Sequence, residues 1–347
     1  MERLIQADGQ PCYGLFPHSP ALINYRDFDF RSPMGRRLGA LAKWRRFHQF
    51  QYFGLMGEQL IGGCALAHLS LVSIAFVYLY HPPSGRLLER RFKAPLGLGS
   101  RFSQAPDDGV CTFRRGRNHL RLENRADEGL RRVRVELDDG LVLDASFREA
   151  ADEAGEGEAA RPFQPLCICT PVASTGWTFA RKVAGVRCHG EVSGPLGRFD
   201  LATLDTFAHH DWSAGFMRPE TCWRWACLSG WVDGRRVGLN LACGVNETSF
   251  TENCFWLDGE LIKVDSVAFR FDRDDPLQPW TITSFDGQVE LTFQGVGLHR
   301  ERLDLLIMAS HFRQVFGRFH GTLRPRGRPS VSIDGLWGFV EDHYAKW

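Results

Sequence analysis

Short runs in which apolar and polar residues alternate recur along this chain, with turn signals between them. The clearest run spans residues 118–139, and Asp-Gly pairs follow similar runs at residues 258–259 and 286–287. Period-two alternation is typical of half-buried strands, and an Asp-Gly pair between two such runs indicates a hairpin. The repetition therefore predicts an all-β chain of about 16 to 20 short strands with few short helices, arranged as antiparallel sandwiches or barrels.

The length of the chain sets how many such units it can build. With 347 residues, of which 44% are hydrophobic and 24% charged, it is long enough for two domains of ordinary size. The glycines and proline of residues 190–197 predict a boundary between an N-terminal β-barrel domain at residues 1–190, wrapped by a proline-rich arm, and a C-terminal β-barrel domain at residues 191–347. The acidic residues 149–160 are expected to form a solvated excursion.

Charge and cysteine usage narrow the classes of partner and cofactor. The balance of 42 basic and 41 acidic residues leaves a net charge of +1, which excludes a strong global attraction to nucleic acid. The N-terminus, MERLIQADGQ, has no basic region followed by an apolar stretch, so we expect a cytoplasmic protein with reduced cysteines. None of the ten cysteines forms a Cys-x-x-Cys pair, and no phosphate-binding glycine loop, serine-nucleophile elbow or His-Glu-x-x-His motif occurs. We therefore expect no metal site and no cofactor.

One apolar segment is long enough to raise the question of a membrane span. Residues 61–80 carry only His68 as an ionisable group and have about the length of a membrane-spanning helix. Their β-branched and aromatic residues, with the adjacent Gly62 and Gly63, favour two consecutive strands instead. Residues 35–47 predict either a short amphipathic helix over a barrel end or a solvated basic face. No transmembrane segment is therefore expected, and a peripheral contact with a membrane stays open.

Residue types that carry out acid-base chemistry concentrate between residues 205 and 246. His210 and Asp211 are adjacent, and Trp223 and Trp225 follow on an alternating run. Ionisable groups beside large aromatic side chains can have their pKa values shifted by desolvation, as a general acid or base requires. The alternative is that the histidine and aspartate belong to a polar loop and the tryptophans to the core. Further candidates for contacting a ligand are Arg218, Arg224, Asn240, Glu252 and Asn253.

Several motifs in the C-terminal half are specific enough to compare with known families. They are Arg224-Trp225-Ala226, Gly238-Leu239-Asn240-Leu241 with Gly244, Glu252-Asn253, the glycines and phenylalanines of residues 316–321, and Gly338 followed by Glu341-Asp342-His343. Together they resemble a bacterial family catalogued as domain of unknown function 2804, and the resemblance extends over nearly the whole chain. That family implies no established activity.

A more distant resemblance bears on the fold. An Asp-His element ahead of a Trp-x-Trp strand is similar to the lipocalin-like group that includes carotenoid 1,2-hydratases, tocopherol cyclase and some Diels-Alder catalysts. The element falls on His210 and Asp211, in reversed order, and the aromatic pair on Trp223 and Trp225. The resemblance implies two lipocalin-like antiparallel β-barrels packed together, with an apolar pocket within or between them for a bulky hydrophobic ligand.

Two functions fit such a pocket. The first, slightly preferred, is a binder of a lipid, acyl or terpenoid-like molecule without turnover, with the tryptophans against the cavity and Arg224 facing a carboxylate head group. The second is an enzyme that hydrates, cyclises or isomerises such a molecule. Asp211 is then the acid, His210 orients it or relays its proton, the tryptophan faces stabilise cationic character, and Arg218, Arg224 and Glu252 supply further polar contacts. A purely partner-binding protein is a third class, which requires an exposed apolar patch.

The chain ends in a second group of ionisable residues. Glu341, Asp342 and His343 are consecutive and lie a few residues before the C-terminus. They predict either an acid-base or metal cluster, or simply the exposed end of the chain.

Overall fold

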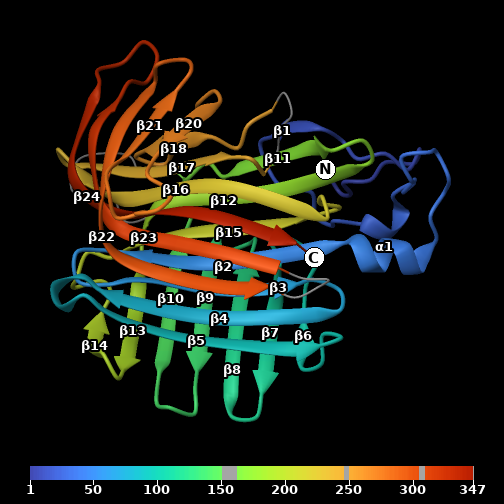
Figure 1. Ribbon diagram of the computed structural model, residues 1–347, viewed down its shortest axis with the longest axis horizontal. Helices are drawn as coiled ribbons and strands as arrows, with labels where there is room; N and C mark the ends of the chain where they lie inside the picture. The colour runs from blue at the N-terminus through green and yellow to red at the C-terminus, as the bar shows by residue number, and fades with distance from the viewer. Residues whose placement is uncertain (151–161, 246–249, 305–308, 347) are drawn as a thin grey trace.

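The protein is built almost entirely from antiparallel strands, which form three sheets (Figure 1). The computed structural model describes residues 1–150, 162–245, 250–304 and 309–346. Within these ranges the helical elements are short: α1 at Ala40–Arg46 and 3-10 turns at Tyr25–Asp27 and Pro82–Ser84. The predicted all-β fold with few short helices is confirmed. Residues 151–160 of the predicted acidic excursion lie outside the described ranges.

The first sheet contains eight strands in the order β1, β11, β12, β15, β2, β3, β4 and β5. Strands β2 to β5 form a meander, whereas β15 comes from later in the sequence and pairs with both β2 and β12. In sheet order the strands span Gly14–Phe16, Leu166–Val172, Gly176–Arg187, Phe207–Gly215, His48–Met56, Ile61–His68, Val72–His81 and Arg86–Pro95.

The second sheet contains seven strands in the order β14, β13, β10, β9, β8, β7 and β6. In Figure 1 its strands cross β4 and β5 of the first sheet at a steep angle. In sheet order they span Gly197–Asp200, His189–Gly194, Val142–Arg148, Leu130–Glu136, Asn118–Arg125, Gly109–Arg115 and Ser100–Arg101.

The third sheet contains nine strands in the order β19, β18, β17, β16, β24, β23, β22, β21 and β20. Strands β22, β23 and β24 are 15 or 16 residues long. One half of each strand packs into an apolar cluster formed within the third sheet, and the other half extends over the first sheet. In sheet order the strands span Glu260–Lys263, Cys254–Leu257, Arg235–Cys243, Glu220–Val232, Val331–Lys346, Ala309–Leu323, Val289–Asp304, Trp280–Ser284 and Val267–Arg270.

The first sheet lies between the second and the third. Successive side chains along its strands point to opposite faces and therefore contact different sheets. On β2, Phe53 packs on Phe147 of the second sheet, with ring centroids 5.3 Å apart. The adjacent Tyr52 packs instead on Trp225 of the third sheet, at 5.9 Å. One apolar cluster includes buried residues from all three sheets. Both faces of the middle sheet are therefore covered by protein.

The apolar segment of residues 61–80 forms two strands, as predicted. It is divided between β3 and β4, which pair antiparallel through a tight turn. In the part of the chain that the structure describes, no helix has the length and apolar character needed to cross a membrane. The basic residues 35–47 do contain a helix, α1, which is limited to seven residues.

The chain passes from the first two sheets to the third between Gly215 and Glu220. Strand β13 runs across residue 190 and pairs with β10, and β15 joins the first sheet. The third sheet begins with β16 at Glu220. By strand pairing, residues up to Gly215 belong with the N-terminal sheets, while the predicted division at residues 190 and 191 stays a prediction about independent domains.

The first and third sheets touch where β12 crosses β17, and two glycines allow the backbones to meet there. A Cβ atom on Gly238 would lie 2.3 Å from the carbonyl oxygen of Ala184. Gly185 has a φ of +84° at a bulge in β12, and its amide donates to the Ser229 hydroxyl at 3.1 Å. Because no side chain fits between the two backbones, glycine is required at the crossing.

Replacing Gly238 by alanine should destabilise the protein, because the added methyl group overlaps the backbone of Ala184. Overpacking of this kind costs about 1–3 kcal/mol, and more where backbone must move. Urea denaturation of Gly238→Ala and the wild type measures the loss. Gly39→Ala is the control, since a Cβ atom there meets nothing within 4 Å. Equal midpoints for Gly238→Ala and the wild type would contradict the close crossing.

Candidate active site

A cavity of about 280 Å³ lies between the first and third sheets. Alternate side chains of a strand point to the same face, so each strand that lines the cavity contributes every second residue to its wall. On β4 the innermost of these residues, Tyr78, is buried, whereas Phe76 and Ile74 are partly exposed. The cavity thus has a closed inner end and a mouth. Its other lining residues include His48, Phe50 and Tyr52 on β2, Asp211 and Ser213 on β15, Thr221, Trp223 and Trp225 on β16, Phe312 and Gln314 on β23, and Glu341, His343 and Ala345 on β24.

The inner end holds one ammonium group between two carboxylates. Lys182 on β12 places its Nζ atom 3.0 Å from Oδ2 of Asp211 and 2.8 Å from Oε1 of Glu252. Burial opposes the charge on Lys182, but the attraction of the two carboxylates is larger and raises its pKa, so the ammonium is retained. The same Nζ atom lies 5.2 Å from the ring centroid of Trp225, a cation–π contact. The Ser213 hydroxyl donates to Oδ1 of Asp211 at 2.6 Å.

Glu341 is a carboxyl group at the inner end whose hydrogen bonds come from neutral donors. Gln314 Nε2 donates to its Oε1 atom at 2.9 Å, and Trp223 Nε1 donates to its Oε2 atom at 3.4 Å. Desolvation by burial raises the pKa of Glu341 to about 8; the two hydrogen bonds and the charge of Lys182 act in the opposite direction but are outweighed. At neutral pH the side chain is therefore a carboxylic acid with a proton to donate.

Two tyrosines and a histidine surround these groups. The hydroxyls of Tyr52 and Tyr78 are 2.7 Å apart, and burial raises the pKa of both. His209 lies on the same face of β15 as Asp211 and packs against the Tyr52 ring, with centroids 5.2 Å apart. Burial lowers the pKa of His209 to about 3. All three side chains are neutral at pH 7, so they hydrogen-bond or pack without adding charge to the inner end.

Four of the predicted site residues line this cavity: Asp211, Trp223, Trp225 and Glu252. Asn240 lies directly behind them. Its Oδ1 atom accepts a hydrogen bond from Trp225 Nε1 at 2.8 Å, and its Nδ2 group donates to the backbone oxygen of Glu252 at 2.8 Å. Asn240 therefore fixes the orientation of the indole and the position of the carboxylate.

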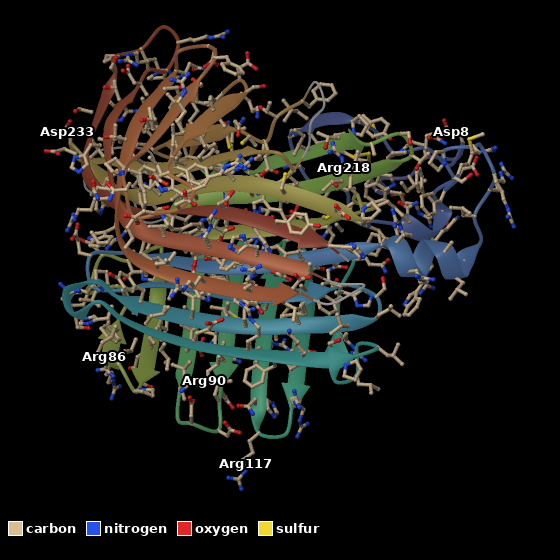
Figure 2. All side chains as sticks on the ribbon, in the orientation of Figure 1. Asp8, Arg86, Arg90, Arg117, Arg218 and Asp233 are labelled. Carbon is tan, nitrogen blue, oxygen red and sulfur yellow. The ribbon has the colours of Figure 1, made fainter. Side chains whose placement is uncertain are left out.

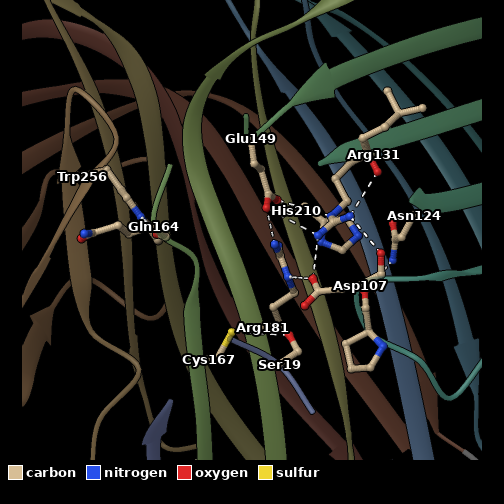
Figure 3. Close-up of polar contacts among 12 residues, drawn as sticks. Ser19, Asp107, Asn124, Arg131, Glu149, Gln164, Cys167, Arg181, His210 and Trp256 are labelled. Atoms are coloured by element: carbon tan, nitrogen blue, oxygen red, sulfur yellow. Dashed lines mark hydrogen bonds and ion pairs between the residues drawn. The ribbon is translucent and has the colours of Figure 1, made fainter. Parts of the chain in front are cut away.

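His210 points away from this cavity, because adjacent residues of a strand face opposite sides. It lies between the first and second sheets, with its Nε2 atom 3.1 Å from Gln51 Nε2. Burial, reinforced by two arginines, lowers the pKa of His210. The structure therefore does not bring His210 and Asp211 together. The neighbours of His210 form a buried ionic network of Asp107, Arg131, Glu149 and Arg181 (Figure 3).

The other three predicted residues do not line the cavity. Arg224 points to the opposite face of β16 from its tryptophan neighbours and pairs with Asp342, with Nε and Oδ1 3.0 Å apart. Asn253 holds backbone, since its Oδ1 atom accepts from the Ala242 amide at 2.7 Å. Arg218 is partly exposed in the segment between β15 and β16 (Figure 2).

Two central residues of the cavity were not singled out as its catalytic groups from the sequence. Lys182 follows Arg181 in an otherwise apolar run, and two charges inside such a run are a signal of buried ion pairs. Glu341 was considered only with the terminal cluster. The structure places that cluster inside strand β24, where Glu341 and His343 face the cavity and Asp342 faces the other side. Among the described residues, no group of three or more histidine, cysteine, aspartate or glutamate side chains is placed to hold a metal ion.

The raised pKa of Glu341 predicts a pH-dependent contribution to stability. The folded state keeps this proton up to about pH 8, whereas the unfolded state releases it near the ordinary value of 4.5. The contribution is complete below pH 4.5 and is lost as the pH rises through 8. Since Glu341→Gln removes it, the variant should gain on the wild type across this window, by an amount on the order of a few kcal/mol.

Urea denaturation at several pH values between these limits measures the gain. Glu290→Gln is the control, because Glu290 is an exposed carboxylate at the surface, paired with Arg324. A free-energy difference between Glu341→Gln and the wild type that stays constant with pH would contradict the raised pKa.

Removing the buried ammonium should destabilise the fold. Lys182→Met leaves Asp211 and Glu252 buried with no cation between them, and breaking a buried ion pair in this way costs about 3–5 kcal/mol. Denaturation at neutral pH measures the change. Lys43→Met is the control, since Lys43 only donates to a backbone oxygen at the surface, and surface changes stay within about 0.5 kcal/mol. Equal losses for both variants would rule out the charged arrangement.

Solved structures with the same fold are found at low sequence identity. Kievitone hydratase from Nectria haematococca is 9% identical, with a TM-score of 0.53, and the match covers 86% of this chain and 89% of that one. CghA with Sch210972 is 11% identical, with a TM-score of 0.57 and coverage of 99% and 96%. An AttH-like protein from Nitrosomonas europaea is 16% identical, with a TM-score of 0.51 and coverage of 94% and 98%. These similarities confirm the predicted lipocalin-like fold.

Family membership rests on the sequence itself. A search of curated proteins gave no match. The model of one family, described as a domain of unknown function, matches residues 25–347, which is nearly the entire length. With that coverage, this chain belongs to the family DUF2804.

Proposed function

We propose that this protein is an enzyme that transfers a proton to a bulky, unsaturated apolar molecule bound in the cavity, and so hydrates, cyclises or isomerises it. The observation that carries the proposal is Glu341, a buried carboxyl group with its pKa raised to about 8. An acid that stays protonated at neutral pH inside an apolar cavity is suited to protonate a carbon–carbon double bond.

The second carboxyl group supplies the complementary base. Asp211 faces the same cavity as Glu341 and is ion-paired with Lys182 at 3.0 Å. The two carboxyl groups therefore lie in different environments, one with an ammonium partner and one with neutral donors. Paired carboxyl groups in contrasting environments are a common arrangement for an acid and a base.

In the proposed step, the Glu341 carboxylic acid donates its proton to one carbon of the substrate double bond, whose electron pair forms the new C–H bond. The cation left on the other carbon is stabilised by the Trp223 indole. For hydration, a water molecule adds to the cation and loses a proton to Asp211. For isomerisation, a carbon next to the cation loses its own proton to Asp211, and the C–H electron pair forms the new double bond. For cyclisation, a second double bond of the substrate first attacks the cation and forms the ring bond, and a carbon next to the new cationic centre then loses a proton to Asp211. Exchange with solvent then restores the proton on Glu341 and the charge on Asp211.

The remaining groups position these two. Gln314 holds the Glu341 carboxyl group by a hydrogen bond of 2.9 Å, and Lys182 and Ser213 hold Asp211. Glu252 also pairs with the Lys182 ammonium and so holds it between its own carboxylate and that of Asp211. Trp225 covers that ammonium, and Trp223 lines the cavity beside Glu341.

Similar structures add support from another direction. Kievitone hydratase has this fold, and its name states a hydration reaction. At 9% identity the likeness carries fold and not chemistry, so the assignment of hydration, cyclisation or isomerisation here depends on the groups in the cavity. Binding without turnover is the second candidate function, because the apolar walls formed by Phe50, Ile74 and Phe76 would hold an apolar molecule in either case. It is the expected result if Glu341 does not transfer its proton to the bound molecule.

The test uses solvent deuterium as the label. The protein is incubated in D₂O with a panel of prenylated phenols and polyenes, and mass spectrometry follows deuterium uptake, with addition of water as a separate mass change. Turnover should incorporate deuterium at carbon, because the Glu341 proton exchanges with solvent. Glu341→Gln should lower the rate by about 10²–10⁴-fold, the usual contribution of a general acid.

Glu290→Gln is again the matched control and should keep the full rate. Displacement of the apolar fluorophore N-phenyl-1-naphthylamine by the same compounds reports occupancy of the cavity independently of chemistry. If the compounds displace the fluorophore but none incorporates deuterium, the protein is a carrier and not an enzyme for them. Full activity in Glu341→Gln would remove Glu341 as the acid.

A further inference from the structure

Three segments meet beside the mouth of the cavity: helix α1, the turn at residues 69–71 between β3 and β4, and the turn at residues 96–99 between β5 and β6. The Ser70 hydroxyl donates to the backbone oxygen of Trp44 at 2.7 Å, which joins the first turn to the helix. The Leu96 amide donates to the carbonyl oxygen of Leu71 at 2.8 Å, which joins the two turns. We call these three segments the mouth rim; it lies at the end of the molecule that carries α1 in Figure 1.

Large apolar side chains project from each segment of the mouth rim into solvent. The exposed fractions are 72% for Leu41, 48% for Leu71, 65% for Leu96 and 67% for Leu98. Single exposed leucines are ordinary on a protein surface, whereas four on connected segments form a patch that marks a contact site.

Helix α1, the residues before it and the residues on either side of the second turn are basic. Residues 34–47, 69–71 and 93–101 contain no aspartate or glutamate, although the chain as a whole carries a net charge of only +1. Of these basic residues, Arg37 pairs with Asp29 of the adjoining arm, with Nε and Oδ1 2.9 Å apart. The basic residues in the three ranges are Arg36, Arg37, Lys43, Arg45, Arg46, Lys93 and Arg101.

The mouth rim is continuous with the wall of the cavity. Leu69 and Val72 line the cavity on either side of the exposed Leu71, and Lys93 lines it just before the second turn. A ligand that enters or leaves by this side therefore passes directly over the exposed leucines.

We propose that the mouth rim docks on the surface of a membrane that contains anionic lipid. The leucines insert among the acyl chains and the basic residues lie against the head groups, which is the arrangement of interfacial amphipathic segments. The mouth of the cavity then faces the apolar layer, so an apolar molecule passes between membrane and cavity without crossing water. This inference uses the apolar cavity but not the acid-base reaction proposed above.

Charge and shape favour a lipid surface over other acidic partners. Nucleic acid would engage the basic residues through its phosphates but would leave the four leucines in water. The leucines come from three separate segments, and a fluid layer accommodates such side chains at different depths without a shaped groove. Basic charge around them matches the negative surface potential of anionic lipid.

Co-sedimentation with vesicles tests the docking. Wild-type protein is mixed with vesicles of phosphatidylcholine alone, or with about 30% phosphatidylserine, whose negative surface potential attracts basic segments. Binding should favour the phosphatidylserine vesicles and weaken in about 0.5 M salt, where charges are screened. Leu71→Glu/Leu96→Glu and Arg45→Glu/Arg101→Glu should each lower the binding constant for these vesicles about tenfold, which corresponds to about 1.4 kcal/mol.

Two variants at distant exposed sites serve as matched controls: Phe285→Glu, at a side chain 74% exposed beyond β21, and Arg117→Glu, in the turn between β7 and β8 (Figure 2). Both should bind vesicles like the wild type. All variants should retain N-phenyl-1-naphthylamine in the cavity, which shows that they fold. The proposal is overturned if the wild type ignores both vesicles, binds them equally, or binds phosphatidylserine vesicles as well with the altered rim as without it.

Discussion

One ammonium group cannot neutralise three carboxyl groups, and this excess of carboxyl groups determines which of them is charged in the cavity between the first and third sheets. Lys182 is shared by Asp211 and Glu252, so the third carboxyl group, Glu341, is left with neutral donors and keeps its proton instead. That outcome depends on the exclusion of water, because desolvation is the largest cause of the raised pKa. The layered architecture provides the exclusion, since these residues lie between the first and third sheets and the second sheet covers the other face of the first.

The fold was predictable from the sequence because its signals are local. The Asp-Gly pair at residues 258–259 does join β18 to β19, and the apolar residues 61–80 do divide into β3 and β4. The cavity was less accessible to such reasoning. Residue type alone points to Trp223, Trp225, Asp211 and Glu252. Lys182 and Glu341 join them only because the arrangement of distant strands brings positions 182, 211, 252 and 341 together.

His210 illustrates why adjacency in sequence is a poor guide within a strand. Because they are adjacent in the sequence, His210 and Asp211 were predicted to act together in acid-base chemistry, but on β15 they face different layers. Between the first and second sheets, beside His210, two arginines and two carboxylates balance each other: Arg131 and Arg181 pair with Asp107 and Glu149. The middle sheet thus carries ionic groups on both faces, and those on the face toward the third sheet, Lys182 and Asp211, line the cavity.

The glycine crossing of β12 and β17 has a geometric consequence for the cavity. Along β12 the side chains of Thr178 and Lys182 line the cavity, and Gly185 follows at the crossing, so the space between the sheets narrows toward the point where the backbones touch. The cavity is a wedge with two glycines at its apex. A methyl group at the apex would push the two backbones apart and open the angle between the sheets. The width of the cavity therefore depends on two residues that do not line it.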